Sequence, residues 1–107
     1  MIIVELIRDN NQAITGFKTS GHAGVAPRGQ DIVCAGVSAL VQSAIMGIER
    51  HLGRDIELMH DTAGTIKMEL IGQPDSLTGA VLETMLLGLN EIAKLYPKSV
   101  RIIEHRR

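Results

Sequence analysis

The chain has 107 residues, of which 45% are apolar and 2% aromatic, and its formal net charge is -1. This length fits one domain, and the apolar share is sufficient for a hydrophobic core. Nucleic-acid binding generally uses basic surfaces and aromatic stacking platforms, and here the only aromatic side chains are Phe17 and Tyr96. We therefore expect a single domain over residues 1–107 that makes no direct contact with nucleic acid.

The start of the chain and its cysteine content predict a cytoplasmic protein. Met1 leads directly into an apolar run that contains Glu5 and lacks a basic leader, so we expect no signal peptide. Cys34 is the only cysteine, which excludes an internal disulfide and is typical of a reducing compartment. No apolar run approaches the ~20 residues of a membrane span, so we expect no membrane partner.

The first half of the chain predicts two strands and a helix. Residues 2–8 are short and rich in β-branched side chains, and a turn cluster at residues 9–12 allows a second strand over 13–20. From Ile32 to His51, apolar residues recur every three or four positions, which predicts an amphipathic helix. Its expected buried stripe is Val33, Val37, Leu40, Ala44, Ile48 and Leu52.

The second half predicts a hairpin, a helix and a last strand. Residues 55–60 and 65–70 alternate between apolar and polar around a glycine-ended turn, which is typical of a β-hairpin. Residues 72–76 break the strand and begin a helix that Pro97 ends. Residues 99–104 form the last strand. The expected buried side of this second helix is Leu77, Val81, Met85, Leu89 and Ile92.

These elements predict an α+β fold with the order strand, strand, helix, strand, strand, helix, strand. Two helices and five strands fit a two-layer sandwich in which both helices pack on one face of a mostly antiparallel sheet.

The chemistry of the chain centres on Cys34, which lies at the start of the first predicted helix. If Asp31 is the N-cap, Cys34 is the third helical residue, where free backbone N–H groups and the helix dipole favour a thiolate. The same N–H groups are able to stabilise the oxyanion of acyl transfer. The competing interpretation is an inert buried cysteine that packs as a small hydrophobe.

His22 supplies the second half of a cysteine nucleophile site. It lies at the expected end of the second strand, and it meets Cys34 only if the loop at Gly24–Gln30 folds back. A histidine beside the thiol would act as its base or its cation partner. A metal shared by the two residues is an alternative, but no CxxC motif or histidine cluster completes a metal site, so we expect none.

Two further residues stand close to this pair in the sequence. Asp31 either caps the helix or orients His22, and capping is the simpler role. Ser38 follows Cys34 by four residues and so shares its helix face, where it either contacts substrate or bonds to the helix backbone.

At these residues the chain resembles the family of ribosomal-processing cysteine proteases called Prp. The resemblance rests on Gly21-His22-Ala23, on the run from Gly29 to Ala35 with Asp31-Ile32-Val33-Cys34, and on Ser38-Ala39. Chain length and element order agree as well, so it covers the whole chain.

The resemblance implies a function and a role for each site residue. It implies that Cys34 is the nucleophile and His22 the general base, with Asp31 supporting activity and with Ser38 and Gly21 binding substrate. It also implies that the protein removes a short N-terminal extension from large-subunit ribosomal protein twenty-seven, as a homodimer and without a cofactor. The loop before the first helix would close over the substrate.

Two other classes of function stay open at this point. A non-catalytic ribosome-associated module would capture a peptide at a free sheet edge, which requires only backbone groups. A thiol redox sensor would need only one reactive cysteine, although the chain has no second cysteine to resolve its oxidised form.

Overall fold

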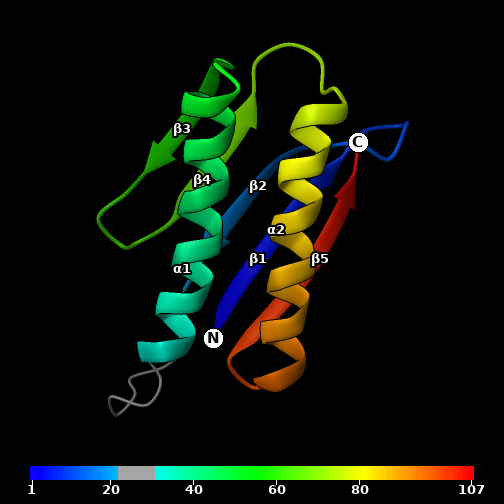
Figure 1. The fold of residues 1–107 in the computed structure, drawn as a ribbon. Helices are drawn as coiled ribbons and strands as arrows, with labels where there is room; N and C mark the ends of the chain where they lie inside the picture. Colours follow the sequence, from blue (N-terminus) through cyan, green and yellow to red (C-terminus); the bar gives the residue numbers. More distant parts are fainter. Residues whose placement is uncertain (22–30) are drawn as a thin grey trace.

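The computed structural model describes residues 1–21 and 31–107, with only the backbone of Asp31, and its elements follow the predicted order (Figure 1). Five strands form one sheet, and two long helices cover one of its faces. The elements are β1 (Ile2–Arg8), β2 (Ile14–Ser20), α1 (Asp31–Met46), its continuation η2 (Gly47–His51), β3 (Ile56–His60), β4 (Ile66–Leu70), α2 (Ser76–Leu95) and β5 (Val100–Arg106). The predicted α+β sandwich is confirmed.

The sheet has the order β3-β4-β2-β1-β5. β1 pairs with β2, β2 with β4, and β3 with β4 in antiparallel fashion, while β1 and β5 run parallel. A parallel pair needs a crossover, which α2 provides between the hairpin and β5. The pairing of β2 with β4 places the end of β2 beside the turn of the β3–β4 hairpin.

The core lies between the helices and the covered face of the sheet, because alternate strand residues point to it. The largest fully buried side chains include Phe17 from β2, Leu6 from β1, Met68 from β4 and Leu89 from α2. The helices pack closely at Gly88, where a Cβ atom would lie 2.9 Å from a terminal carbon of Leu40 and would require that side chain to shift. The end of the Leu40 side chain fills the space beside Gly88.

Helix α1 buries nearly the predicted stripe. Its buried members are Val33, Val37, Val41, Ala44, Ile45 and Ile48, whereas Leu40 is half-buried against the other helix. The helix begins at Asp31, so Asp31 belongs to its first turn rather than preceding it as predicted. Its last turn, η2, is π-helical and not α-helical, with Leu52 N–H donating to the Gly47 carbonyl oxygen five residues earlier.

Helix α2 buries the predicted Met85 and Leu89, and the predicted Val81 and Ile92 pack against the core as half-buried residues, but the prediction for its first turn was wrong. Leu77 is 60% exposed, and the buried positions are Thr78, Leu82, Met85, Leu86 and Leu89. The N-cap explains the difference: the Asp75 carboxylate accepts hydrogen bonds from Leu77 N–H and Thr78 N–H, while Thr78 Oγ1 accepts one from Asp75 N–H. This capping box fixes the first turn with Thr78 inward and Leu77 outward.

The prediction that no apolar run approaches the length of a membrane span was wrong. The segment Ile32–His51 is long and apolar enough to cross a membrane by length and composition alone, with a mean hydropathy of 1.7. A core helix meets the same criterion, and here the apolar stripe of the segment packs on the sheet. The 33% of the segment that is buried faces this core.

Candidate active site

Cys34 is the fourth residue of α1 and lies at the boundary between the core and the surface. It is half-buried and packs against the core beside the buried Val33 and Val37. The thiol also lines an open pocket of about 150 Å³. A residue in this position is neither a fully buried packing group nor a freely solvated one, which weakens the interpretation of Cys34 as an inert core cysteine.

The pocket collects residues from four parts of the fold. Cys34, Val37, Ser38 and Val41 come from α1, Thr19 and Ser20 from β2, and Ile2 from β1; Gly21, Gly64 and Ile66 complete the lining. Gly64 belongs to the turn of the β3–β4 hairpin, and Ile66 begins β4. The lining combines apolar side chains with the hydroxyl groups of Thr19, Ser20 and Ser38, as in a site that binds one side chain and orients the adjoining backbone.

Three of the predicted site residues therefore meet in one pocket: Cys34, Ser38 and Gly21. Ser38 follows Cys34 by one helical turn, and its Oγ accepts a hydrogen bond of 2.9 Å from Gln42 Nε2. Ser38 therefore has a side-chain partner and a place in the pocket, in addition to any bond that it makes to the helix backbone. His22, the loop Gly24–Gln30 and the side chain of Asp31 lie outside the described residues.

Gly21 has a structural reason to be glycine. Its φ angle is +82°, in the left-handed region, and a Cβ atom there would lie 2.2 Å from the carbonyl oxygen of Met1. The end of β2 therefore passes very close to the start of the chain, next to Ile2 in the wall of the pocket. Any side chain at Gly21 would push these two segments apart and deform the pocket.

The pocket contains the predicted Cys34, Ser38 and Gly21, but most of its lining was not predicted from the sequence. Thr19, Gly64 and Ile66 belong to the pocket because β4 pairs with β2, with Thr19 opposite Ile66. Residues 19 and 66 are 47 positions apart in the sequence. No local sequence pattern predicts that they pair. The predicted alternation of the hairpin placed Ile66 on the same face as Met68. That alternation was the one signal in the sequence that Ile66 faces the core side of the sheet.

Among the residues that the structure describes, no group of three or more histidine, cysteine, aspartate or glutamate side chains could hold a metal ion. In this part of the chain, the chemistry at the pocket is that of a thiol, hydroxyl groups and the first turn of a helix. The first turn carries backbone N–H groups without intrahelical partners, and its dipole favours an anion. This combination suits nucleophilic attack by Cys34 on a carbonyl group.

Comparison with known proteins agrees with this chemistry. The family model for cysteine protease Prp matches residues 1–101. The ribosomal processing cysteine protease Prp of Bacillus subtilis is 30% identical over 95% of this chain and 96% of its own length, and that of Mycoplasma pneumoniae is 33% identical over 82% and 85%.

Solved structures show the same fold. The Prp protease from S. aureus, crystallised with a covalently linked product peptide, has a TM-score of 0.90 and 25% identity, covering 98% of this chain and 100% of its own. A Streptococcus mutans protein has a TM-score of 0.89 and 28% identity, covering 100% of this chain and 96% of its own. The chain therefore belongs to the cysteine protease Prp family, and it is a cysteine protease.

Proposed function

We propose that this protease removes a short N-terminal extension from the precursor of large-subunit ribosomal protein twenty-seven, with Cys34 as nucleophile and His22 as general base. The observation that carries the proposal is the shared pocket of Cys34, Ser38 and Gly21 at the start of α1. Two relatives are named ribosomal processing cysteine proteases, which supports a ribosomal protein as the substrate.

The proposed reaction has two steps. His22 takes the proton of the thiol, the Cys34 sulfur attacks the scissile carbonyl carbon, and the amine leaves with a proton from His22. Water, activated by His22, then attacks the thioester and releases the extension as a carboxylic acid. A covalently linked product peptide in the S. aureus relative supports a covalent route. Asp31 is proposed to support the pair, and no cofactor is needed.

Each residue around the thiol has a part in this scheme. The helix N-terminus favours the developing oxyanion, because the oxyanion is negative. Ser38 is one turn away in the same pocket, which supports its proposed contact with the substrate backbone. Gly21 keeps the end of β2 close to Met1 and is followed in the sequence directly by His22. Gly21 thus links the pocket wall to the proposed base.

We further propose that the protein acts in the cytoplasm and as a homodimer, as the family resemblance implies. The face of the sheet opposite the helices carries no second layer in the described part of the chain (Figure 1). That face includes Ile7, which is only 9% exposed, and half-buried Ile3 and Ile103. Light scattering on the purified protein would measure the mass in solution, and a monomer at micromolar concentration would contradict the dimer.

The activity is tested by incubating the purified protease with the ribosomal protein precursor and weighing the products by mass spectrometry. We expect one new N-terminus and loss of the extension with the unaltered enzyme, and no product with Cys34→Ala or His22→Ala. Circular dichroism of each variant provides the folding control. Equal cleavage by Cys34→Ala would contradict the proposed mechanism. An intact precursor after incubation with the unaltered enzyme would contradict the proposed substrate.

A further inference from the structure

A second pocket, of about 170 Å³, opens beside the first, between the outer side of α1 and the β3–β4 hairpin. Its lining comes from α1 and η2 on one side and from β3 and β4 on the other. The lining residues are Gln42, Ile45, Met46, Arg50, Leu58, His60 and Ile66. Nothing in the proposed mechanism uses this pocket.

The two pockets form one continuous groove. Ile66 lines both of them, so they meet at the start of β4. On the helix side, Ser38 belongs to the first pocket and Gln42 to the second, and the 2.9 Å hydrogen bond between their side chains joins the two walls. The groove therefore begins at Cys34 and continues along α1 toward η2.

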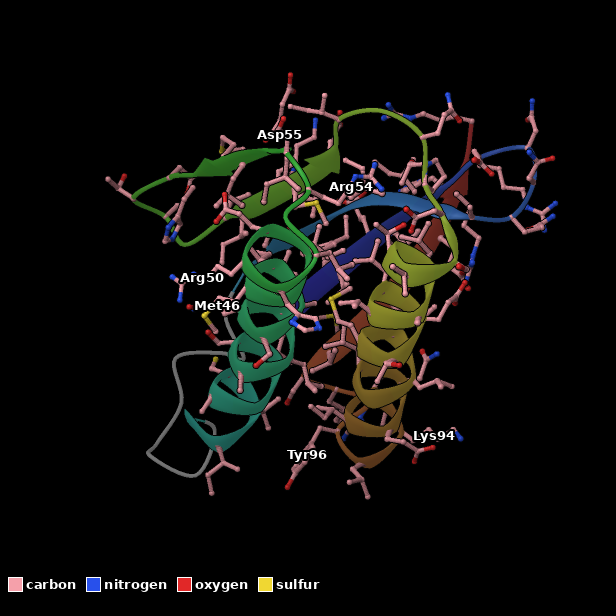
Figure 2. All side chains as sticks on the ribbon, turned by 45° about the horizontal axis from the view of Figure 1, so that its top comes forward. Met46, Arg50, Arg54, Asp55, Lys94 and Tyr96 are labelled. Carbon is pink, nitrogen blue, oxygen red and sulfur yellow. The ribbon has the colours of Figure 1, made fainter. Side chains whose placement is uncertain are left out.

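The far part of the groove combines exposed apolar surface with hydrogen-bond donors. Met46 is 41% exposed and Leu58 is 51% exposed, and they face a floor that includes the buried Ile45. Arg50 and His60 lie in the same lining, which contains no acidic residue among those described. Figure 2 shows Met46 and Arg50 projecting from the side of the helix that faces away from α2. Exposed apolar side chains with adjacent donors favour an apolar side chain and the carbonyl oxygens beside it.

The dimensions fit an extended peptide. Met46 follows Cys34 by twelve residues on one helix, which corresponds to about 18 Å at ~1.5 Å per residue. An extended peptide advances ~3.3 Å per residue, so about five residues cover that distance. The helix changes to a π-helical turn immediately after Met46, and such turns are frequent at functional sites.

We propose that this groove is a distal substrate subsite, in which Met46 and Leu58 bind an apolar side chain about five residues from the scissile bond. This inference rests on the proposed function, because it takes Cys34 as the point of cleavage. Arg50 and His60 donate hydrogen bonds to carbonyl groups of the same peptide, and Ile66 contacts the chain between the two pockets. The enzyme thus selects its substrate by a segment longer than the residues next to the cleaved bond.

The test uses peptides from the N-terminal region of the ribosomal protein precursor. The long peptide extends about eight residues on each side of the cleaved bond and reaches the far pocket, whereas the short one extends about three and does not. Binding is measured by fluorescence anisotropy on the Cys34→Ala protein, so that no turnover occurs. We expect the long peptide to bind at least about tenfold more tightly than the short one.

Met46→Gln and Leu58→Gln, each in the Cys34→Ala protein, should remove that difference. Leu87→Gln is the matched control, since Leu87 is a 67% exposed apolar residue on the other helix. The control should keep the full difference. Equal affinity of the two peptides for the Cys34→Ala protein, or an unchanged difference in both groove variants, would overturn the proposal. A change in oligomeric state in both groove variants, with the affinity difference intact, would instead identify the groove as an interface between copies.

A failure of the groove proposal is distinguishable from a failure of the proposed function. Cleavage is followed in parallel with the enzyme that retains Cys34, on the complete precursor. Tight binding of the long peptide without cleavage of the precursor would uphold the groove and overturn the proposed reaction. Cleavage with equal binding of both peptides would uphold the reaction and overturn the groove.

Discussion

Helices α1 and α2 lie side by side on the same face of the sheet, yet they use their polar side chains in opposite ways (Figure 1). In α2, Asp75 and Thr78 bond to each other, and Glu83 bonds to Arg8 of β1. In α1, Ser38 and Gln42 bond to each other and line the groove. These polar groups of α2 bond within the fold, whereas those of α1 line an open groove.

The clearest case on the structural side is the cluster around Arg8. Its guanidinium donates two hydrogen bonds to Glu83, of 2.7 and 3.1 Å, and one of 2.6 Å to Glu104 on β5. The hydrogen bonds from Arg8 to Glu83, and to a smaller extent the one to Glu104, hold the pKa of Arg8 above its ordinary value. The cluster ties α2 to β1 and β5 at the end of the sheet away from Cys34.

The comparison predicts that substitutions in α2 change stability and that substitutions on the outer side of α1 change catalysis. The largest effect on stability is expected for Leu89→Ala, because Leu89 is fully buried at the centre of the core. The free energy of unfolding should fall by about 2–5 kcal/mol. Urea denaturation followed by circular dichroism measures it. Where the variant is folded, its kcat/KM should stay within about twofold of the unaltered enzyme.

Leu87→Ala is the control for Leu89→Ala, since Leu87 lies on the exposed side of the same helix. Its free energy of unfolding should change by less than about 0.5 kcal/mol. Equal destabilisation by the two substitutions would contradict the buried face described for α2.

Arg8→Met should have the next largest effect. It removes the bonds to Glu83 and Glu104 and leaves two half-exposed carboxylates without their cation. We expect a loss of about 1–2 kcal/mol in the free energy of unfolding, since exposure of the carboxylates weakens each ion pair. Lys94→Met breaks only an exposed ion pair with Glu91 and should cost at most about 0.5 kcal/mol. Similar losses in the two variants would show that the Arg8 cluster is no stronger than a surface pair.

Substitution of Ser38 or Gln42 by alanine tests the other half of the comparison. Each should lower kcat/KM by about three- to tenfold, because Ser38 loses either its substrate contact or the bond that orients it. The free energy of unfolding should change by less than about 0.5 kcal/mol. Because the two side chains act as a unit, the double variant should lose less than the sum of the single losses. Ser43→Ala, on an exposed position of the same helix outside both pockets, is the matched control.

The smallest effect concerns the acid sensitivity of the α2 N-cap. Hydrogen bonds from Thr78 N–H and then Leu77 N–H, with the charge of Arg54, hold the pKa of the Asp75 carboxyl below its ordinary value of 3.8. A lowered pKa in the folded state stabilises the fold above the ordinary value, and this contribution is lost as the pH falls through the folded value. The melting temperature of Asp75→Asn should lie below that of the unaltered protein near neutral pH, with the gap closing below about pH 4. A gap that stays constant down to pH 2 would show that the charge of Asp75 contributes nothing.

Much of this fold could be predicted because its signals are local. The period of the apolar residues predicted α1, and the alternation on either side of residues 61–64 predicted the hairpin. The position of Cys34 near the start of a predicted helix made it the candidate nucleophile. Only the first turn of α2 was predicted wrongly, because the Asp75–Thr78 capping box, rather than the apolar pattern, decides which way Leu77 points.

The parts that could not be predicted depend on contacts between distant segments. Ile66 reaches the pocket of Cys34 only through the pairing of β4 with β2, and the groove beyond it exists because the hairpin lies beside α1. The requirement for glycine at position 21 arises from Met1, which is distant in sequence but adjacent in the fold. His22 as the base stays a prediction of the sequence and its family.

The central claim is that α1 presents Cys34 as the nucleophile of a peptide-cutting site. The most direct measurement treats the protein with a peptidyl chloromethyl ketone that carries the precursor sequence before the cleaved bond, followed by mass spectrometry of the intact and digested protein. We expect one peptide attached per chain, on the sulfur of Cys34, with the modification slowed by substrate peptide and absent in Cys34→Ala. Attachment at another residue, or labelling of Cys34 that substrate peptide does not slow, would contradict the account.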